Sequence, residues 1–284
     1  MIDQLLSIVW NPDKEIFRIG HVAILYYSLC WCIGLFLGYL IVRKLYEDQK
    51  IKESLFEPLF IYCLVGIFVG ARLGHCFFYD PAYYFGSLKH FIEIFFPIHF
   101  AQNTWDWRYV GYEGLASHGG TIGLMIALWM YVKKTKINLM RVLDNIAIAT
   151  PIAACCIRLG NLMNSEIVGK ATDVAWGFIF VRNGENFARH PAQLYEAIAY
   201  LIIFFIGYYI YKKHKEKVGS GFFFGYCIAT IFTFRFLVEF LKEEQGGLDQ
   251  GLLIDMGQIL SIPFIILGIA CMIGGPWLKK IAEK

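Results

Sequence analysis

The chain has 284 residues, of which 57% are hydrophobic, 17% aromatic and only 17% charged. Soluble domains average roughly 45–50% apolar and about 25% charged residues, so this composition argues against a water-soluble protein. The formal net charge is +3, from 26 Lys and Arg against 23 Asp and Glu, which indicates neither a nucleic-acid partner nor a strongly acidic substrate. The composition therefore predicts an integral membrane protein.

Seven apolar stretches approach the length of a membrane-spanning helix, which is about 20 residues for a hydrocarbon core of roughly 30 Å. They predict an all-α fold: a polytopic integral membrane protein with seven transmembrane helices in a single domain over residues 1–284. The stretches lie near residues 19–42, 55–79, 118–132, 142–162, 195–211, 221–241 and 252–275. The segment His90–Phe100 is too short to span, so we expect it to be interfacial or re-entrant.

The distribution of basic residues between loops predicts the orientation of the chain, because Lys and Arg in short loops are retained in the cytoplasm. The basic residues after the first, third, fifth and seventh predicted helices are Arg43, Lys44, Lys50 and Lys52; Lys133, Lys134, Lys136 and Arg141; Lys212, Lys213, Lys215 and Lys217; and Lys279, Lys280 and Lys284. Between the sixth and seventh helices only Lys242 occurs. We therefore expect the N-terminus outside, the C-terminus in the cytoplasm, and ordered outer loops at 80–117 and 163–194.

The cysteines do not indicate a metal or disulfide framework, and the N-terminal residues do not indicate a removable signal peptide. The eight cysteines lie in apolar runs without clear metal-ligand spacing, so we expect reduced, packed thiols and no metal site. Met1–Phe17 has no basic stretch followed by an apolar core and a cleavage site. We therefore expect the first span itself to direct the chain to the membrane.

Charged groups within membrane spans are costly and usually face a protein interior or a watery cavity. In the predicted orientation nearly all of them lie at the outer ends of helices two to six. The polar residues at these ends are Arg72, His118, Arg158, Asn161, Asn164, Glu166, His190, Gln193, Glu196, Arg235 and Glu239. We expect five helices to bring polar side chains to one level, at an outward-facing site.

The segment Ser117–Gly123 opens the third predicted helix with a histidine followed by glycines. Gly119 and Gly120 leave room for close approach of a backbone or ligand, and a helix N-terminus favours a bound anion. His118 can accept a proton at this position. The alternative is a histidine with an interfacial partner beside glycines that serve helix packing.

Arg158 and Asn161 are three residues apart and share a helix face. A guanidinium beside amide groups suits a phosphate, which arginine binds through two parallel hydrogen bonds. Alternatively, Arg158 extends to lipid headgroups and pairs structurally with Glu166. The density of polar residues in this segment favours the phosphate site.

Two further pairs of polar residues are spaced to share a helix face. Arg235 and Glu239 are four residues apart and could form a purely structural ion pair. Gln193 and Glu196 follow Pro191 in a segment typical of a helix start, where they could simply cap the helix. The convergence of separate helices favours an active site over these structural alternatives.

At these residues the chain closely resembles the prolipoprotein diacylglyceryl transferase family of bacterial membrane enzymes. The resemblance spans nearly the whole chain, and the ordered set of motifs is far more specific than any single one. The motifs are Tyr26–Ser28, Gly70–Gly74, Ser117–Gly120, Arg158–Gly169, Arg189–Glu196, Arg235–Glu239 and Met256–Pro263.

The resemblance implies a transferase of the bacterial cytoplasmic (inner) membrane with its active site toward the periplasmic or outer side. The expected reaction transfers the diacylglyceryl group of phosphatidylglycerol to the lipobox cysteine thiol of a preprolipoprotein signal peptide. A thioether forms and glycerol phosphate leaves, as the first step of lipoprotein maturation. The implied partners are phosphatidylglycerol, the signal peptide and the lipid bilayer, with no nucleic acid and no metal or organic cofactor.

The resemblance also implies roles for individual residues. The expected phosphatidylglycerol-binding residues are Tyr27, Arg158, Asn161, Glu166, Gly169, Arg235 and Glu239, and the expected supporting residues are Arg72, Gly119, Gly120, His190, Gln193 and Glu196. The predicted catalytic residues are Arg158 and Arg235, which would stabilise the leaving phosphate, and His118, which would accept the cysteine proton. Ile231 stands where family members often have a tyrosine, so no hydroxyl role is assigned there.

Two other classes of protein are alternatives to this enzyme. A transporter or channel also carries intramembrane charge, but transporters usually bind near the midplane between structural repeats. Here the charges gather at one end and no repeat is visible. A non-catalytic phospholipid-binding protein would need Arg158 but not His118.

Overall fold

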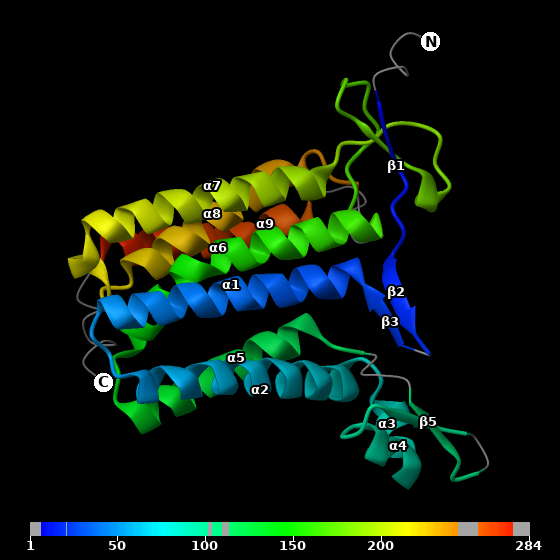
Figure 1. Cartoon of the computed structure of the whole chain (residues 1–284), viewed down its shortest axis with the longest axis horizontal. Helices are drawn as coiled ribbons and strands as arrows, with labels where there is room; N and C mark the ends of the chain where they lie inside the picture. The colour runs from blue at the N-terminus through cyan, green and yellow to red at the C-terminus, as the bar shows by residue number, and fades with distance from the viewer. Residues whose placement is uncertain (1–6, 21, 102–103, 110–113, 244–254, 275–284) are drawn as a thin grey trace. The chain divides into compact units, whose positions relative to one another are not determined.

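The computed structural model describes residues 7–20, 22–101, 104–109, 114–243 and 255–274. The described chain is mostly helical and divides into two compact units, each considered by itself (Figure 1). Unit 1 comprises Met1–Leu45 and Met140–Lys284, and unit 2 comprises Tyr46–Leu139.

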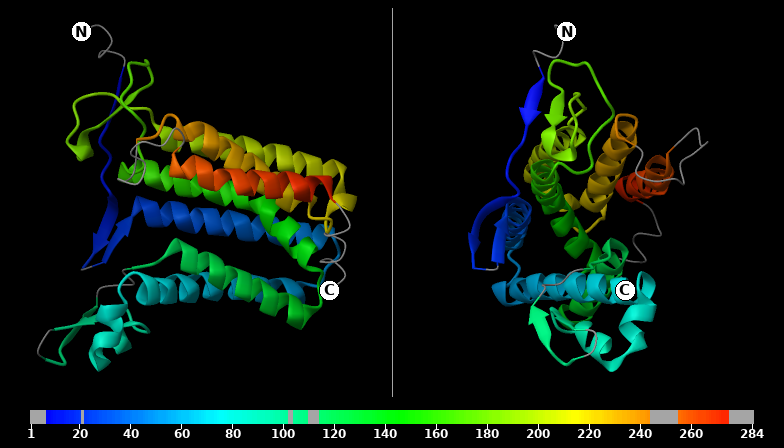
Figure 2. Two further views of the ribbon diagram at one scale, coloured as in Figure 1. Left: turned by 180° about the vertical axis from the view of Figure 1, so that it is seen from behind. Right: turned by 90° about the vertical axis from the view of Figure 1, so that its right-hand side faces the viewer.

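Unit 1 is a bundle of long helices. It contains most of α1 (Tyr26–Asp48) and α6 (Leu139–Asn164), together with α7 (Ala192–Lys213), α8 (Phe222–Glu239) and α9 (Met256–Ile273). Helix α8 contacts both α7 and α9 (Figures 1 and 2). Half of the apolar window of α6 is buried, the largest share among the candidate spans in the described residues, so α6 is the central helix of unit 1.

Five described helices are long and apolar enough to cross a membrane: α1, α2 (Glu53–Phe78), α6, α7 and α8. The protein is therefore a multi-pass helical membrane protein. All seven predicted stretches overlap helices, although α5 (Ser117–Thr135) is not among the five and the apolar part of α9 is shorter. The predicted limits at 252 and 275, and the basic residues Lys279, Lys280 and Lys284, lie outside the described residues. A count of seven spans stays a prediction.

The predicted start of the first helix at residue 19 is wrong. The segments Glu15–Ile19 (β2) and Val22–Leu25 (β3) form an antiparallel hairpin, and α1 begins only at Tyr26. Val22 and Ile24 lengthen the apolar run, but their β-branched side chains favour a strand. The described residues contain three two-stranded sheets, none of which the all-α expectation included.

The N-terminal segment is ordered against the predicted outer loop 163–194. Strand β1 (Ile8–Trp10) pairs in parallel with β6 (Phe178–Phe180), which is followed by the short 3₁₀ helix η2 (Val181–Asn183). The indole Nε1 of Trp10 donates to the carbonyl oxygen of Leu162 at 2.9 Å. These contacts attach both segments to the end of α6.

The other end of the bundle is held by a buried carboxylate on α6. The first backbone N–H groups of a helix have no partner within the helix, and a negative charge near them is favourable. Asp144 is fully buried and accepts from the N–H groups of Gly219 at 2.8 Å, Gly221 at 3.0 Å and Phe224 at 2.9 Å. Asp144 thereby fixes the start of α8, after the 3₁₀ helix η3 (Lys215–Lys217), to α6.

Unit 2 is built on the close packing of α2 against α5. A methyl group added at Gly119 would collide with the carbonyl oxygen of Gly70, and one at Gly123 would collide with that of Gly66. Small residues at such positions let two helix backbones approach closely. The packing alternative considered for the glycines after His118 therefore applies to Gly119. A methyl group at Gly120 would make ordinary contacts, 3.5 Å from Ala71.

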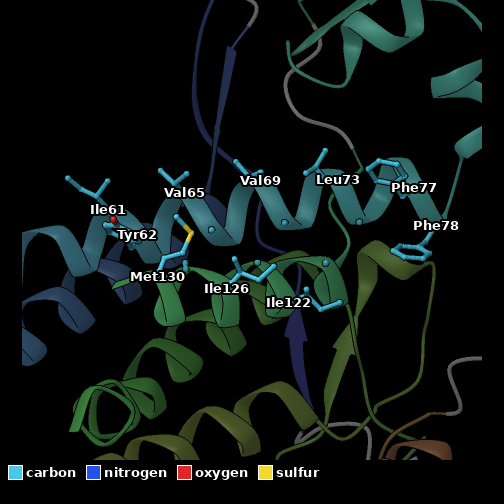
Figure 3. A pocket seen from close by; sticks show the side chains of 16 residues that line it. Ile61, Tyr62, Val65, Val69, Leu73, Phe77, Phe78, Ile122, Ile126 and Met130 are labelled. Carbon is cyan, nitrogen blue, oxygen red and sulfur yellow. The ribbon is translucent and has the colours of Figure 1, made fainter. Parts of the chain in front are cut away.

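An apolar groove of about 600 Å³ runs along the α2–α5 pair (Figure 3). Its labelled side chains are Ile61, Tyr62, Val65, Val69, Leu73, Phe77 and Phe78 from α2 and Ile122, Ile126 and Met130 from α5. No charged side chain lines the groove among the residues that the structure describes. This surface is compatible with contact to hydrocarbon.

The described parts of the predicted loop 80–117 are also ordered. They form the short helices α3 (Pro81–Gly86) and α4 (Leu88–Glu93) and the antiparallel strands β4 (Ile98–Phe100) and β5 (Trp107–Tyr109). The segment His90–Phe100 is thus the end of α4 followed by β4, and an interfacial or re-entrant position for it stays a prediction.

Candidate active site at the ends of α6, α7 and α8

The ends of α6 and α7 are joined by an ion pair. Arg158, near the end of α6, has its Nε 3.1 Å from Oε2 of Glu196, which lies in the first turns of α7. The Glu196 side chain is fully buried and that of Arg158 is 13% exposed. The hydroxyl of buried Tyr200 donates to Oε1 of Glu196 at 3.0 Å. The carboxylate partner of Arg158 is thus Glu196 and not Glu166 as in the predicted structural alternative; Arg158 reaches Glu166 only through Asn161, to whose Oδ1 its Nη1 donates at 3.4 Å.

A lysine that the sequence did not single out joins this pair to α8. Lys242 follows the end of α8, and its side chain is only 5% exposed. Its Nζ lies 3.4 Å from Oε2 of Glu196 and 3.4 Å from Oε2 of Glu239. Burying a lysine is costly unless it is paired, so these two carboxylates account for its position.

Arg235 differs from Arg158 and Lys242 in that no carboxylate of the described residues pairs with it. Glu239, four residues further along α8, pairs with Lys242, and the alternative of a structural Arg235–Glu239 pair is wrong. Within the described residues the guanidinium of Arg235 has no carboxylate partner and instead lies 5.7 Å from the ring centre of Phe232. Arg158 and Arg235 are both within electrostatic range of the Tyr200 hydroxyl, so the two arginines converge on one region.

The segment after α6 forms a tight, polar turn. Asn161 donates through Nδ2 to Oε1 of Glu166 at 2.6 Å, and Gln193 donates through Nε2 to the carbonyl oxygen of Glu166 at 2.6 Å. Ser165 and Ile167 have φ values of 57° and 59°, a left-handed conformation that is costly for a β-branched residue. A strained backbone conformation persists only where surrounding contacts hold it in place, and such conformations are common at functional sites.

Gly169 continues this turn into a bridge between three segments. Its N–H donates to the carbonyl oxygen of His190 at 2.9 Å, and it forms an antiparallel bridge with Lys242. A methyl group there would come within 2.6 Å of His190 and 2.7 Å of the Leu241 carbonyl oxygen, so only glycine fits. Burial lowers the pKa of the half-buried His190, whose Nδ1 lies 3.1 Å from the Tyr195 hydroxyl.

Tyr27 lies at the start of α1, against α6. A methyl group at Gly160 would come within 3.0 Å of its ring, so the small residue makes room for the tyrosine. The hydroxyl is within electrostatic range of both Glu166 and Arg158. Tyr27 thus belongs to the same end of unit 1 as the two arginines.

The remaining predicted residues lie in unit 2. Arg72 is buried and donates to the carbonyl oxygens of Glu93 at 2.6 Å and Ile94 at 3.2 Å and to the hydroxyl of Tyr84 at 3.2 Å. These bonds fix the loop after α4 to α2. His118 is exposed in the first turn of α5. The roles predicted for Arg72, His118, Gly119 and Gly120 beside Arg158 stay predictions.

The site in unit 1 combines two arginines, a buried lysine and carboxylates at one end of several apolar helices. Its cations suit an anion rather than a metal ion, and no group of three or more His, Cys, Asp or Glu side chains in the described part of the chain could hold one. The fold and this site define a multi-pass membrane protein with a cluster of arginine, lysine and glutamate side chains at the ends of its helices.

Comparisons with known proteins identify the family. The model of the prolipoprotein diacylglyceryl transferase family matches residues 14–274, and the chain belongs to this family. Proteins named phosphatidylglycerol–prolipoprotein diacylglyceryl transferase are similar to it. The one from Bacteroides fragilis is 56% identical over 96% of both chains, and the one from Porphyromonas gingivalis is 40% identical over 92% of both. The one from Tolumonas auensis is 37% identical over 93% of this chain and 96% of its own.

Proposed function

We propose that this chain transfers the diacylglyceryl group of phosphatidylglycerol to the lipobox cysteine of prolipoproteins. The cysteine sulfur forms a bond to the glycerol carbon of the diacylglyceryl group, and the bond from that carbon to the phosphate oxygen breaks. The thiol proton passes to a base, and glycerol phosphate leaves. Membership of the family and the names of the similar proteins support this reaction.

The observation that carries the proposal is the charge balance around Arg235. Arg158, Lys242 and Arg235 supply three positive charges, and Glu196 and Glu239 supply two negative charges. Glu166 is more exposed and accepts from the amide of Asn161. Of the three cations, only Arg235 has no carboxylate contact among the described residues, and the negative charge of a phosphodiester could pair with it. Arginine binds phosphate through a planar fork of donors, so Arg235 is suited to it, together with Nη2 of Arg158, whose Nη1 donates to Oδ1 of Asn161 at 3.4 Å.

The proposed mechanism assigns the remaining steps to individual residues. Arg158 and Arg235 stabilise the negative charge that develops on the leaving phosphate. Tyr27, Asn161, Glu166, Gly169 and Glu239 shape the headgroup site, and His190, Gln193 and Glu196 support it. His118 accepts the thiol proton directly or through water, because an imidazole nitrogen can act as a general base.

The topology belongs to the same proposal. Seven spans in one transmembrane catalytic domain place the N-terminus outside and the C-terminus in the cytoplasm of a bacterium. The arginine site then faces the periplasmic or outer side of the cytoplasmic (inner) membrane, where secreted preproteins emerge. The basic loops after odd-numbered predicted helices support this orientation.

The test is mass spectrometry of a synthetic lipobox peptide after incubation with purified protein and phosphatidylglycerol vesicles. The expected result is a peptide whose mass rises by one diacylglyceryl group, with the group located on the cysteine by fragmentation. A peptide with serine in place of the cysteine is the matched control and should stay unmodified. If folded protein leaves the cysteine peptide unchanged, the proposed function is wrong.

A further inference from the structure

Lys242 holds a position that neither its sequence context nor the family's expected site explains. It lies just beyond α8, and its backbone forms an antiparallel bridge with Gly169. The neighbouring Leu241 carbonyl oxygen accepts from the N–H of Lys170 at 2.7 Å. Lys242 is therefore fixed by the backbone between the end of α8 and the turn that follows α6.

The ammonium group of Lys242 is shared between two helices. It lies 3.4 Å from both carboxylate oxygens of Glu196 on α7 and 3.4 Å from Oε2 of Glu239 on α8. Glu196 is fully buried, so the lysine offsets part of the cost of burying this carboxylate. The same contacts link the position of Glu239 to that of the Arg158–Glu196 pair.

Two cations compete for Glu239. Arg235 precedes it by four residues and Lys242 follows it by three, and both spacings permit an ion pair along a helix. The carboxylate is also confined by α9, because a methyl group at Gly257 would come within 2.7 Å of its Oε1. The structure resolves this competition in favour of Lys242.

Which cation pairs with Glu239 decides whether the guanidinium N–H groups of Arg235 remain available to a ligand. While Lys242 holds Glu239, Arg235 has no carboxylate partner among the described residues. Lys242 also contacts Glu196, whereas Arg158 contacts Glu196 through Nε and donates through Nη1 to Oδ1 of Asn161. Without the lysine, Glu239 would be free to pair with Arg235, and neither arginine would remain without a carboxylate partner.

We propose that Lys242 is a positioning residue that occupies Glu239 and thereby keeps Arg235 available to the lipid phosphate. This inference rests on the proposed function. Lys242 acts through Glu239 and does not itself touch the substrate. Without Lys242, Glu239 competes with the lipid phosphate for Arg235 and is displaced at saturating lipid, so the loss of Lys242 weakens lipid binding more than it slows the chemical step.

The test compares Lys242→Met and Lys242→Arg with the wild-type protein, using phosphatidylglycerol at varied fraction in phosphatidylcholine vesicles and a fixed lipobox peptide. We expect Lys242→Met to raise KM for phosphatidylglycerol at least about tenfold with kcat changed less than about threefold. Lys242→Arg keeps the charge and should restore most of the affinity. Lys213→Met, at an exposed lysine at the end of α7, is the matched control and should leave both constants unchanged.

A second background isolates the route through Glu239, and it removes one of the two carboxylates that Lys242→Met leaves without this cation. Glu239→Gln removes the carboxylate that would otherwise turn to Arg235, so adding Lys242→Met to it should change KM by less than about threefold. A tenfold effect of Lys242→Met in the Glu239→Gln background would overturn the inference. So would an unchanged KM in the single variant, or a loss confined to kcat. A wild-type protein that forms no product would refute the proposed function instead.

Discussion

Replacing Arg235 with alanine separates a role in substrate binding from a role in the fold. The side chain is partly exposed, has no carboxylate partner in the described part of the chain, and lies 5.7 Å from the ring centre of Phe232. A cation–π contact of this kind contributes about 0.5–1 kcal/mol. The free energy of unfolding should therefore fall by no more than about 1 kcal/mol, which thermal unfolding in detergent measures.

The effect on catalysis should be far larger. Removing one donor that stabilises developing negative charge typically costs a factor of about 10²–10³ in kcat, or about 2.7–4 kcal/mol. We expect the initial rate of diacylglyceryl-peptide formation by Arg235→Ala to fall by this factor. Arg235→Lys should retain part of the rate, because it keeps the charge but loses the planar fork of donors. Arg108→Ala, at an exposed arginine on β5, is the control and should be fully active.

Either of two results would refute this reasoning. Full activity of a folded Arg235→Ala protein would mean that the unpaired guanidinium does not serve the reaction. A loss of activity that parallels a loss of several kcal/mol in unfolding free energy would mean that Arg235 is structural. Quantitative mass spectrometry of the peptide and thermal unfolding on the same preparation distinguish the two.

Three further changes have definite expected outcomes. His118→Gln should lower kcat for the lipobox peptide, because an amide cannot accept the thiol proton; full turnover of this variant would exclude His118 as the base. Asp144→Ala leaves three backbone N–H groups before and at the start of α8 without their acceptor, so the free energy of unfolding should fall by about 1–3 kcal/mol. Thermal unfolding measures this loss, and Asp144→Glu should restore part of it. An unchanged midpoint for Asp144→Ala would contradict the prediction. Gly119→Ala places a methyl group against the carbonyl oxygen of Gly70 and should destabilise unit 2 by about 1–3 kcal/mol, whereas Gly38→Ala, which meets nothing within 4 Å, should have no cost.

The long helices could be predicted from the sequence because each coincides with a continuous apolar run. The same signal failed at the start of α1, where Val22–Leu25 is as apolar as the helix that follows but pairs with Glu15–Ile19 as a strand. Hydropathy measures how apolar a segment is and not which backbone it adopts. The hairpin depends on a pairing that a hydropathy pattern does not contain.

The site was predictable in its residue types and less so in its pairings. The clustering of polar residues at helix ends indicated Arg158, Glu196 and Arg235, and the first two are in contact. Spacing along one helix suggested that Arg235 pairs with Glu239, yet the pairing partner is Lys242. Spacing identifies which residues can meet, but a choice between two cations depends on the packing of neighbouring helices.

Lys242 was used in the sequence analysis only to predict orientation, whereas in the structure this lysine is buried and paired with Glu196 and Glu239. As the only basic residue between two predicted spans, it indicated orientation and nothing more. Its burial follows from the bridge between Gly169 and Lys242, which joins residues far apart in the sequence. A lysine directly after a helix that ends in Arg235 and Glu239 was the available signal, because residues three or four apart share a face.

The most direct test of the central claim is the stoichiometry of the transfer. Phosphatidylglycerol labelled in its headgroup is incubated with the purified protein and a lipobox peptide, and released glycerol phosphate is counted against modified peptide. The account predicts one glycerol phosphate for each diacylglyceryl peptide, with no release when the cysteine is replaced by serine. Headgroup label retained on the peptide, or release that does not depend on the cysteine, would contradict it.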